Sequence, residues 1–239
     1  MKEYFEKVYS GTEQSFHDVV REKIKNEEKM FIVTANPETL MIAEENEDFK
    51  KCLLDDNTII VPDGIGVIKG MKMLKFQTNG TITGVELAKK VLEFANDEKK
   101  SIYLFGAKKE VIDGMRNLLG NSYPNIEILG MQDGYVGDKQ KVFEDIIDKK
   151  PDIVLVALGI PHQELLIYNN LDRFEKGIFI GVGGTFDVLS GMKKRAPKIF
   201  IKTHTEWLYR ITTEPKRLKR FFKSNVRYIM KVKRERKTQ

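Results

Sequence analysis

The 239-residue chain contains a single cysteine, Cys52, and no apolar run that approaches the roughly 18 residues of a membrane-spanning helix. One cysteine cannot close an intrachain disulfide or build a cysteine-based zinc site, so a reducing compartment, the cytoplasm by default, is expected. The N-terminus is charged throughout and has no apolar signal-peptide core. These absences predict a protein that is neither exported nor threaded through a bilayer.

Patterns that hold metals or nucleotides are also scarce. The histidines His17, His162 and His204 are far apart, and no Asp-x-Asp pair occurs of the kind that holds a divalent ion on a sugar diphosphate. There is no Gly-x-x-x-x-Gly-Lys-[Ser/Thr] loop and no Gly-x-Ser-x-Gly elbow. The glycines of 64–70 approach a dinucleotide fingerprint, but the third comes one residue late, which disfavours an NAD(P)-dependent oxidoreductase. We therefore expect no metal and no cofactor.

What the chain has is an ordinary globular composition with an uneven charge distribution. It is 41% hydrophobic and 32% charged, which excludes disordered and low-complexity classes. Residues 192–239 carry 17 Lys and Arg against 3 acidic residues, whereas the preceding chain carries 24 basic against 32 acidic residues. An acidic body with a basic tail suggests a polyanionic partner, either an anionic membrane surface or a nucleic acid.

Short β-branched segments alternate with segments of helical period. The expected strands are Met30–Thr34, Thr58–Val61, Ser101–Phe105, Ile126–Leu129, Ile153–Leu158 and Ile178–Val182. The expected helices are Gln14–Glu28, Glu38–Ala43, Glu86–Ala95, Glu110–Leu119, Lys139–Lys149 and Glu164–Leu171, and Thr83 and Glu86 have the spacing of a capping box. This order predicts an α/β fold, a Rossmann-like, mostly parallel sheet with helices on both faces, over residues 1–191.

Residues 192–239 form a different segment, predicted to be a basic helical appendage interrupted near Pro215. Trp207, Phe222 and other apolar residues recur at helical spacing among lysines and arginines. This aromatic, amphipathic pattern fits burial or membrane contact better than base stacking, so a nucleic-acid-binding module is the weaker alternative. Simple packing on the body or on another subunit also stays open.

Four polar clusters follow predicted strands, where ligands bind in open parallel sheets. Asp63 precedes Gly64 and is the candidate base, with capping of the next helix as its alternative. Gly183 and Gly184 could offer backbone N–H groups to phosphate or merely form a tight turn. Asn36 reads first as a helix cap, although it shares its strand end with Thr34. Gln163 and Glu164 open another helix and suit a ligand rich in hydroxyl groups, although polar residues there are also ordinary.

In order along nearly the whole chain, these clusters resemble the WecG/TagA/CpsF family of bacterial glycosyltransferases, also called glycosyltransferase family 26. The matching segments are Thr34–Glu38, Pro62–Gly64, Thr83–Leu87, Ala157–Glu164, Gly181–Asp187 with Gly191, Arg195–Pro197, Glu206–Arg210 and Glu214–Pro215 with Arg217. The resemblance implies an inverting, metal-independent enzyme that moves a sugar from a UDP-sugar to an undecaprenyl-diphosphate-linked acceptor. In the TagA-like branch the donor is UDP-N-acetylmannosamine, the acceptor is lipid-linked N-acetylglucosamine, and the product is the linkage unit of wall teichoic acid. A different UDP-sugar donor, for capsule or exopolysaccharide, is the alternative.

The resemblance also implies roles for single residues. Asp63 would take the proton from the acceptor hydroxyl. The residues expected to bind substrate are Thr34, Asn36, Gly64, Gln163, Glu164, Gly183, Gly184, Asp187, Arg195, Arg210, Arg217 and Arg220. The tail would close over the site and hold the enzyme on the inner face of the cell membrane, and self-association is left open.

Two positions depart from the family pattern. Thr81 stands where many members have Arg, which removes a charge from that loop. His162 stands where Lys is common, which is a milder change.

Overall fold

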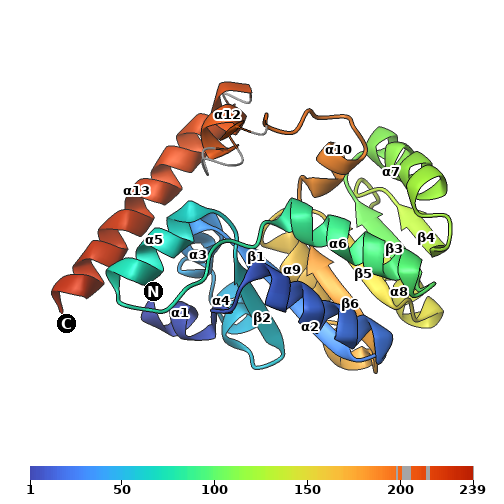
Figure 1. Cartoon of the computed structure of the whole chain (residues 1–239), viewed down its shortest axis with the longest axis horizontal. Coiled ribbons are helices and arrows are strands. Elements are labelled where there is room, and N and C mark those ends of the chain that lie inside the picture. Colours follow the sequence, from blue (N-terminus) through green and yellow to red (C-terminus); the bar gives the residue numbers. More distant parts are fainter. Residues whose placement is uncertain (198, 201–205, 214–215, 239) are drawn as a thin grey trace.

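The computed structural model describes residues 1–197, 199–200, 206–213 and 216–238. Its centre is one six-stranded parallel sheet in the order β2-β1-β6-β5-β3-β4 (Figure 1). The strands are β1 (Lys29–Ala35), β2 (Thr58–Pro62), β3 (Ser101–Gly106), β4 (Glu127–Gln132), β5 (Ile153–Ala157) and β6 (Gly177–Gly181). All six predicted strands are present, and the parallel α/β fold is confirmed.

Helices cover both faces of this sheet because side chains alternate between faces along each strand. On β1, Met30 and Ile32 belong to one apolar cluster, whereas Phe31 and Val33 belong to the other. The first cluster is closed by α2 (Glu13–Lys25), α6 (Gly84–Asp97), α7 (Lys109–Ser122) and α10 (Thr185–Leu189). The second is closed by α1 (Lys2–Lys7), α3 (Pro37–Ala43), α4 (Glu47–Leu54), α5 (Ile65–Met73), α8 (Lys139–Lys149), α9 (His162–Tyr168) and α13 (Lys216–Lys237).

The six predicted helices correspond to α2, α3, α6, α7, α8 and α9, and their ends differ by a few residues. Side-chain caps explain where two of these helices, α3 and α6, begin. Asn36 Oδ1 accepts from the backbone N–H groups of Glu38 and Thr39, at 2.9 and 3.1 Å, so the predicted cap at Asn36 is confirmed. Thr83 Oγ1 accepts from the N–H of Glu86 at 3.4 Å. Helices α1, α4, α5 and α10 were not predicted, because they are short and, in α5, almost uniformly apolar.

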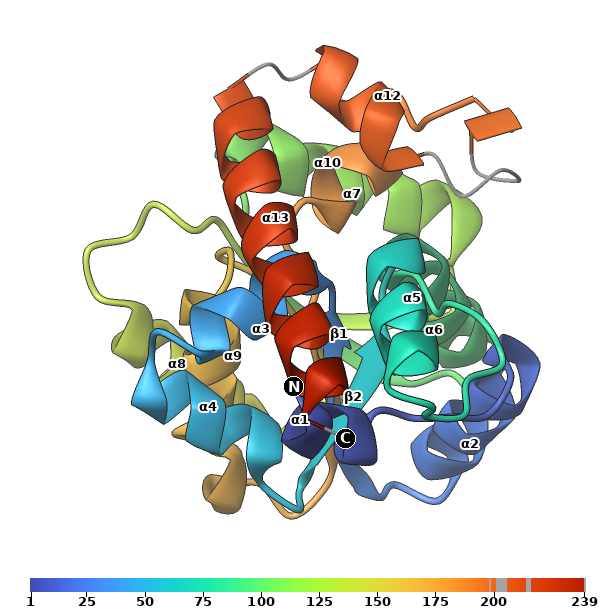
Figure 2. The ribbon, with the colours of Figure 1, turned by 90° about the vertical axis from the view of Figure 1, so that its left-hand side faces the viewer.

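The tail contains α12 (Glu206–Thr213) and α13, and the expected interruption near Pro215 falls between them, outside the described residues. Figure 2 shows α13 lying across the molecule beside α3 and α5. Tyr228 and Val232 of α13 are 2% and 0% exposed and belong to the same cluster as α3 and α5. The second half of α13 is therefore part of the folded body. The division at residue 191 stays a prediction.

Three polar contacts strengthen this attachment. The N-terminal amine of Met1 donates to Glu235 Oε1 at 2.7 Å, and Arg227 and Lys231 pair with Glu45 and Glu44 beyond the end of α3. Gly66 of α5 leaves room for α3, since an added side-chain carbon there would lie 2.6 Å from Pro37 Cγ, and Gly70 leaves room for the Tyr228 ring of α13. The C-terminal helix is thus joined to the first residue of the chain.

Candidate active site

The four polar clusters follow β2, β1, β6 and β5, which are neighbours in the sheet. Parallel strands end at the same edge, so the structure brings the ends of these four strands together. Thr34 and Asn36 stand at the end of β1, Asp63 and Gly64 after β2, Gly183 and Gly184 after β6, and Gln163 and Glu164 after β5. We refer to this edge as the strand-end site.

Backbone pairing holds Asp63 directly after the carboxyl end of β2. Its N–H donates to the carbonyl of Ala35 at 2.8 Å, which extends the β1–β2 pairing by one step, and its side chain is half-buried. Gly64, not Asp63, occupies the N-cap position of α5. Gly64 has a φ of +90°, which L-residues rarely adopt, and open space where a side chain would be. A ligand can therefore approach the backbone directly beside Asp63.

Thr34 lies near the first residues of two helices, α6 and α10. A side-chain carbon placed on Gly84, the first residue of α6, would lie 3.4 Å from Thr34 Oγ1 and 3.7 Å from Thr185 Oγ1. The end of β1 and the first turns of α6 and α10 thus converge on two hydroxyl groups. Thr185 was not selected from the sequence, although it directly follows the glycine pair after β6.

Thr81 lies beside the end of β2, because the N–H of its neighbour Ile82 donates to the carbonyl of Pro62 at 2.9 Å. The residue that departs from the family pattern is therefore next to the loop that holds Asp63. His162, the other departure, is exposed at the start of α9.

Gln163 does not point its amide into an open site. Its Oε1 accepts from the N–H of Gly159 at 3.0 Å and from the N–H of Gly183 at 3.1 Å. Its Nε2 donates to Glu164 Oε1 at 2.7 Å. The side chain joins the loop after β5 to the loop after β6, and its 2% exposure leaves little surface for a ligand.

Glu164 is also 2% exposed, and burial raises the pKa of its carboxyl group to about 7, partly offset by the hydrogen bond from Gln163. Cys52 of α4 is buried nearby, and its thiol pKa is raised by burial and by Glu164. With a pKa of about 7, this carboxyl group is about half protonated at pH 7, so it is not a permanent anion at the site.

Asp187 and Arg195 hold the segment that follows α10. Asp187 pairs with Lys193 at 3.4 Å and accepts the Lys193 N–H on its backbone carbonyl at 2.8 Å. Arg195 pairs with Glu86 in the first turn of α6, so it stands near the end of β1. Glu86 is thus a partner of the site that sequence reasoning assigned only to a helix cap.

The three remaining arginines lie on the helices of the tail. Arg210 is in α12, and Arg217 and Arg220 are in the first two turns of α13, but their side chains lie outside the described part of the chain. Figure 1 shows α12 and the start of α13 at the same end of the molecule as α10. This placement leaves their expected contacts with substrate a prediction.

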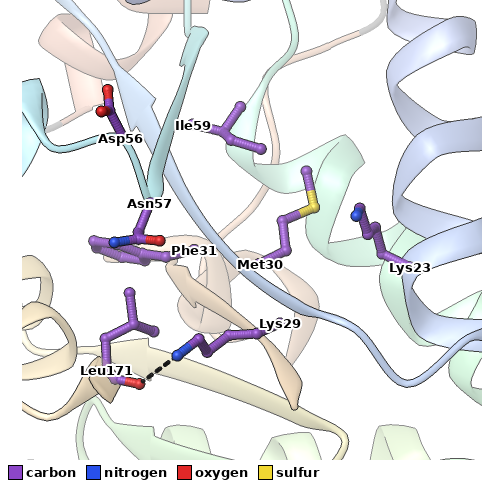
Figure 3. Close-up of a pocket in the computed structure, with 8 residues that line it drawn as sticks. All are labelled: Lys23, Lys29, Met30, Phe31, Asp56, Asn57, Ile59 and Leu171. Carbon is purple, nitrogen blue, oxygen red and sulfur yellow. Dashed lines mark hydrogen bonds between the residues drawn. The ribbon is translucent and has the colours of Figure 1, made fainter. Parts of the chain in front are cut away.

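A hollow of about 180 Å³ lies elsewhere. Figure 3 shows it at the amino ends of β1 and β2, where Lys29 Nζ donates to the carbonyl of Leu171 at 3.3 Å. Its lining residues are Lys23, Lys29, Met30, Phe31, Asp56, Asn57, Ile59 and Leu171. It occupies the opposite edge of the sheet from Asp63. Among residues 1–197, 199–200, 206–213 and 216–238, no cluster of three His, Cys, Asp or Glu side chains could hold a metal ion.

The model of the glycosyl transferase WecG/TagA/CpsF family matches residues 6–239. An N-acetylglucosaminyldiphosphoundecaprenol N-acetyl-β-D-mannosaminyltransferase of Bacillus subtilis (strain 168) is 43% identical over 206 residues, which is 86% of this chain and 80% of the relative. The protein of the same name from Staphylococcus aureus (strain NCTC 8325 / PS 47) is 37% identical over 192 residues, 80% of this chain and 75% of the relative.

Proposed function

Since the chain belongs to the WecG/TagA/CpsF family of glycosyltransferases, we propose that it transfers N-acetylmannosamine from UDP-N-acetylmannosamine to undecaprenyl-diphosphate-linked N-acetylglucosamine. The product would be the disaccharide linkage unit of wall teichoic acid. Two relatives that are named for this transfer match most of the chain, and they support the choice of sugar and acceptor. The observation that carries the proposal is the convergence of the four family segments on one edge of the sheet.

Asp63 is the proposed general base. The acceptor hydroxyl gives its proton to the carboxylate, its oxygen forms a bond to C1 of the donor sugar, and the bond from C1 to the diphosphate oxygen breaks, so that UDP leaves. Attack from the face opposite the leaving group inverts C1. The half-buried position of Asp63 and the open space beside Gly64 support this role.

The departing UDP leaves negative charge on its diphosphate, which the site has to stabilise. Arg195 lies beside the start of α6, where the helix dipole is positive. We assign the rest of the positive charge to Arg210, Arg217 and Arg220, because guanidinium groups bind phosphate oxygens in pairs and need no metal for it. In this proposal Thr34 and Asn36 contact the donor from the end of β1.

The surface of α13 supports attachment to the inner face of the cell membrane. Phe222, Val226, Ile229 and Met230 are 52%, 51%, 46% and 65% exposed, and their spacing places them along one side of the helix. Trp207 and Leu208 of α12 are 40% and 43% exposed. Exposed Lys223, Lys233 and Arg234 accompany this apolar stripe. Among the described residues, no helix is long and apolar enough to cross a membrane. An apolar stripe with basic neighbours suits insertion among anionic lipid head groups.

The test is a panel of UDP-sugars incubated with lipid-linked N-acetylglucosamine, with UDP release and product mass as readouts. We expect turnover with UDP-N-acetylmannosamine, also in the presence of EDTA. Turnover with a different donor alone would replace the proposed sugar, and a requirement for magnesium or manganese would contradict the metal-independent mechanism. Binding to RNA without flotation on anionic liposomes would favour the nucleic-acid alternative for the tail.

A further inference from the structure

The side chain of Gln163 is held in one orientation by its neighbours. Two backbone N–H groups, those of Gly159 and Gly183, both point at Oε1. An amide nitrogen cannot accept these bonds, so the oxygen must face them and Nε2 must face Glu164. The acceptor at Glu164 Oε1, 2.7 Å away, completes the arrangement. We call this set of three hydrogen bonds the Gln163 bridge.

The sheet leaves space for the bridge. Gly181 is the last residue of β6 and lies between β1 and β5 in register. A side-chain carbon on Gly181 would lie 2.7 Å from Gln163 Nε2 and 2.8 Å from Glu164 Oε1, closer than such contacts occur. The absence of a side chain at Gly181 is therefore what allows the two polar side chains to sit against the strand.

Glu164 is a costly residue at this position. Its carboxyl group is buried, its Oε2 atom has no hydrogen-bond partner in the part of the chain that the structure describes, and burial raises its pKa. Buried polar atoms without partners destabilise a fold, and an apolar side chain of similar size would avoid this. Stability alone does not account for Glu164.

We propose that Glu164 is a positioning residue for the transfer reaction: its carboxyl group fixes the Gln163 amide, and that amide holds the loops after β5 and β6 together. The loop after β6 leads within two residues to Thr185, whose hydroxyl lies near Thr34. Movement of these loops would displace the groups at the ends of β1 and β6. The inference rests on the proposed function for its activity readout only.

The test uses Glu164→Met, which removes the acceptor, and Glu164→Gln, which keeps an oxygen facing Gln163 and mimics the protonated acid. We expect Glu164→Met to lower kcat about ten- to a hundredfold, because small displacements in an active site have effects of this order. The kcat of Glu164→Gln should be at least fivefold higher than that of Glu164→Met. Asn170→Leu, which removes another buried polar side chain at the far end of α9, is the matched control and should leave kcat unchanged.

A double-mutant cycle separates positioning from a direct role. If Glu164 acts through Gln163, Glu164→Met should have no further effect on kcat in a Gln163→Met background. An effect as large as in the wild-type background would overturn the proposal, and so would wild-type kcat in folded Glu164→Met.

Amide hydrogen exchange gives a readout that needs no substrate. The N–H groups of Gly159 and Gly183 should exchange at least tenfold faster in Glu164→Met than in the wild type, and slowly again in Glu164→Gln. Unchanged exchange would overturn the proposal. A wild-type protein that transfers no sugar but shows this exchange pattern would contradict the proposed function and leave the bridge intact.

Discussion

The two edges of the sheet differ in how they hold one carboxyl group each, the buried Glu164 and the half-buried Asp152. At the strand-end site, Glu164 accepts a hydrogen bond from the Gln163 amide, and burial raises its pKa to about 7. At the amino edge, burial also raises the pKa of Asp152, but hydrogen bonds from Ser101 and Lys176 outweigh it and hold the pKa below its usual value. Both carboxylate oxygens of Asp152 accept hydrogen bonds, as stability requires, whereas Glu164 Oε2 has no donor among the described residues. This contrast is expected where structure is constrained by function.

The largest expected effect tests which edge carries the chemistry. Asp63→Asn should lower turnover by roughly 10²-fold or more, because a positioned general base contributes about 10²–10⁴. Asp56→Asn, at the hollow of the amino edge, removes a carboxylate that is fully exposed and should leave turnover unchanged. Steady-state kinetics with UDP release measures both, and circular dichroism checks the fold. Equal turnover of the two variants would break the contrast.

The second expected effect is a pH dependence of the free energy of unfolding that comes from Glu164 at the strand-end site. The Glu164 pKa is raised from 4.5 to about 7, so the folded protein binds a proton that the unfolded chain has released, and stability falls as pH rises through this window. This shift corresponds to about 3 kcal/mol. Glu164→Gln should therefore be more stable than the wild type at pH 8, with little difference at pH 4. Urea unfolding at both values measures this, and a constant difference would contradict the assignment.

The contribution of Asp152 to stability should depend on pH with the opposite sign. Its pKa is lowered, so its stabilisation is present above the unfolded pKa of about 3.8 and disappears as pH falls through the folded value. Asp152→Asn should cost about 1–3 kcal/mol near pH 7, because it weakens the bonds from Ser101 and Lys176. Turnover of the folded variant should stay at the wild-type level. If Asp152→Asn lowered the free energy of unfolding no more at pH 7 than at pH 3, the charge of Asp152 would be unimportant for stability.

The smallest effect concerns membrane binding at the two ends. Lys223 is exposed in the first half of α13, at the site end, whereas Lys23 lies at the hollow of the amino edge. Lys223→Gln should weaken flotation on anionic liposomes by about 1 kcal/mol at low salt, and less at high salt. Lys23→Gln should not change flotation. A similar loss for both variants would mean that membrane attraction depends on total charge rather than on the site end.

The sequence predicted the features that depend on neighbouring residues. The strands are short apolar runs, most of them rich in Ile and Val. Asn36 is a cap because its side chain reaches two N–H groups of the following turn, and the polar clusters are recognised by their place after a strand. Family resemblance added roles for Asp63 and the arginines, which remain predictions. These inferences need little more than chain order.

The tertiary structure decided what depends on distant residues. Nothing local to β5 or β6 says that they are neighbours, yet this pairing brings Gly183 to Gln163, whose amide joins the two loops. A contact of Gln163 with substrate stays a prediction. Likewise, α13 reads as a uniform basic helix, but Tyr228 is buried against α5 while Val226 stays exposed. The sequence determines the period of a helix or strand. Burial, and with it the pKa of a group such as Glu164, is set by which surfaces meet, and that depends on contacts across the whole chain.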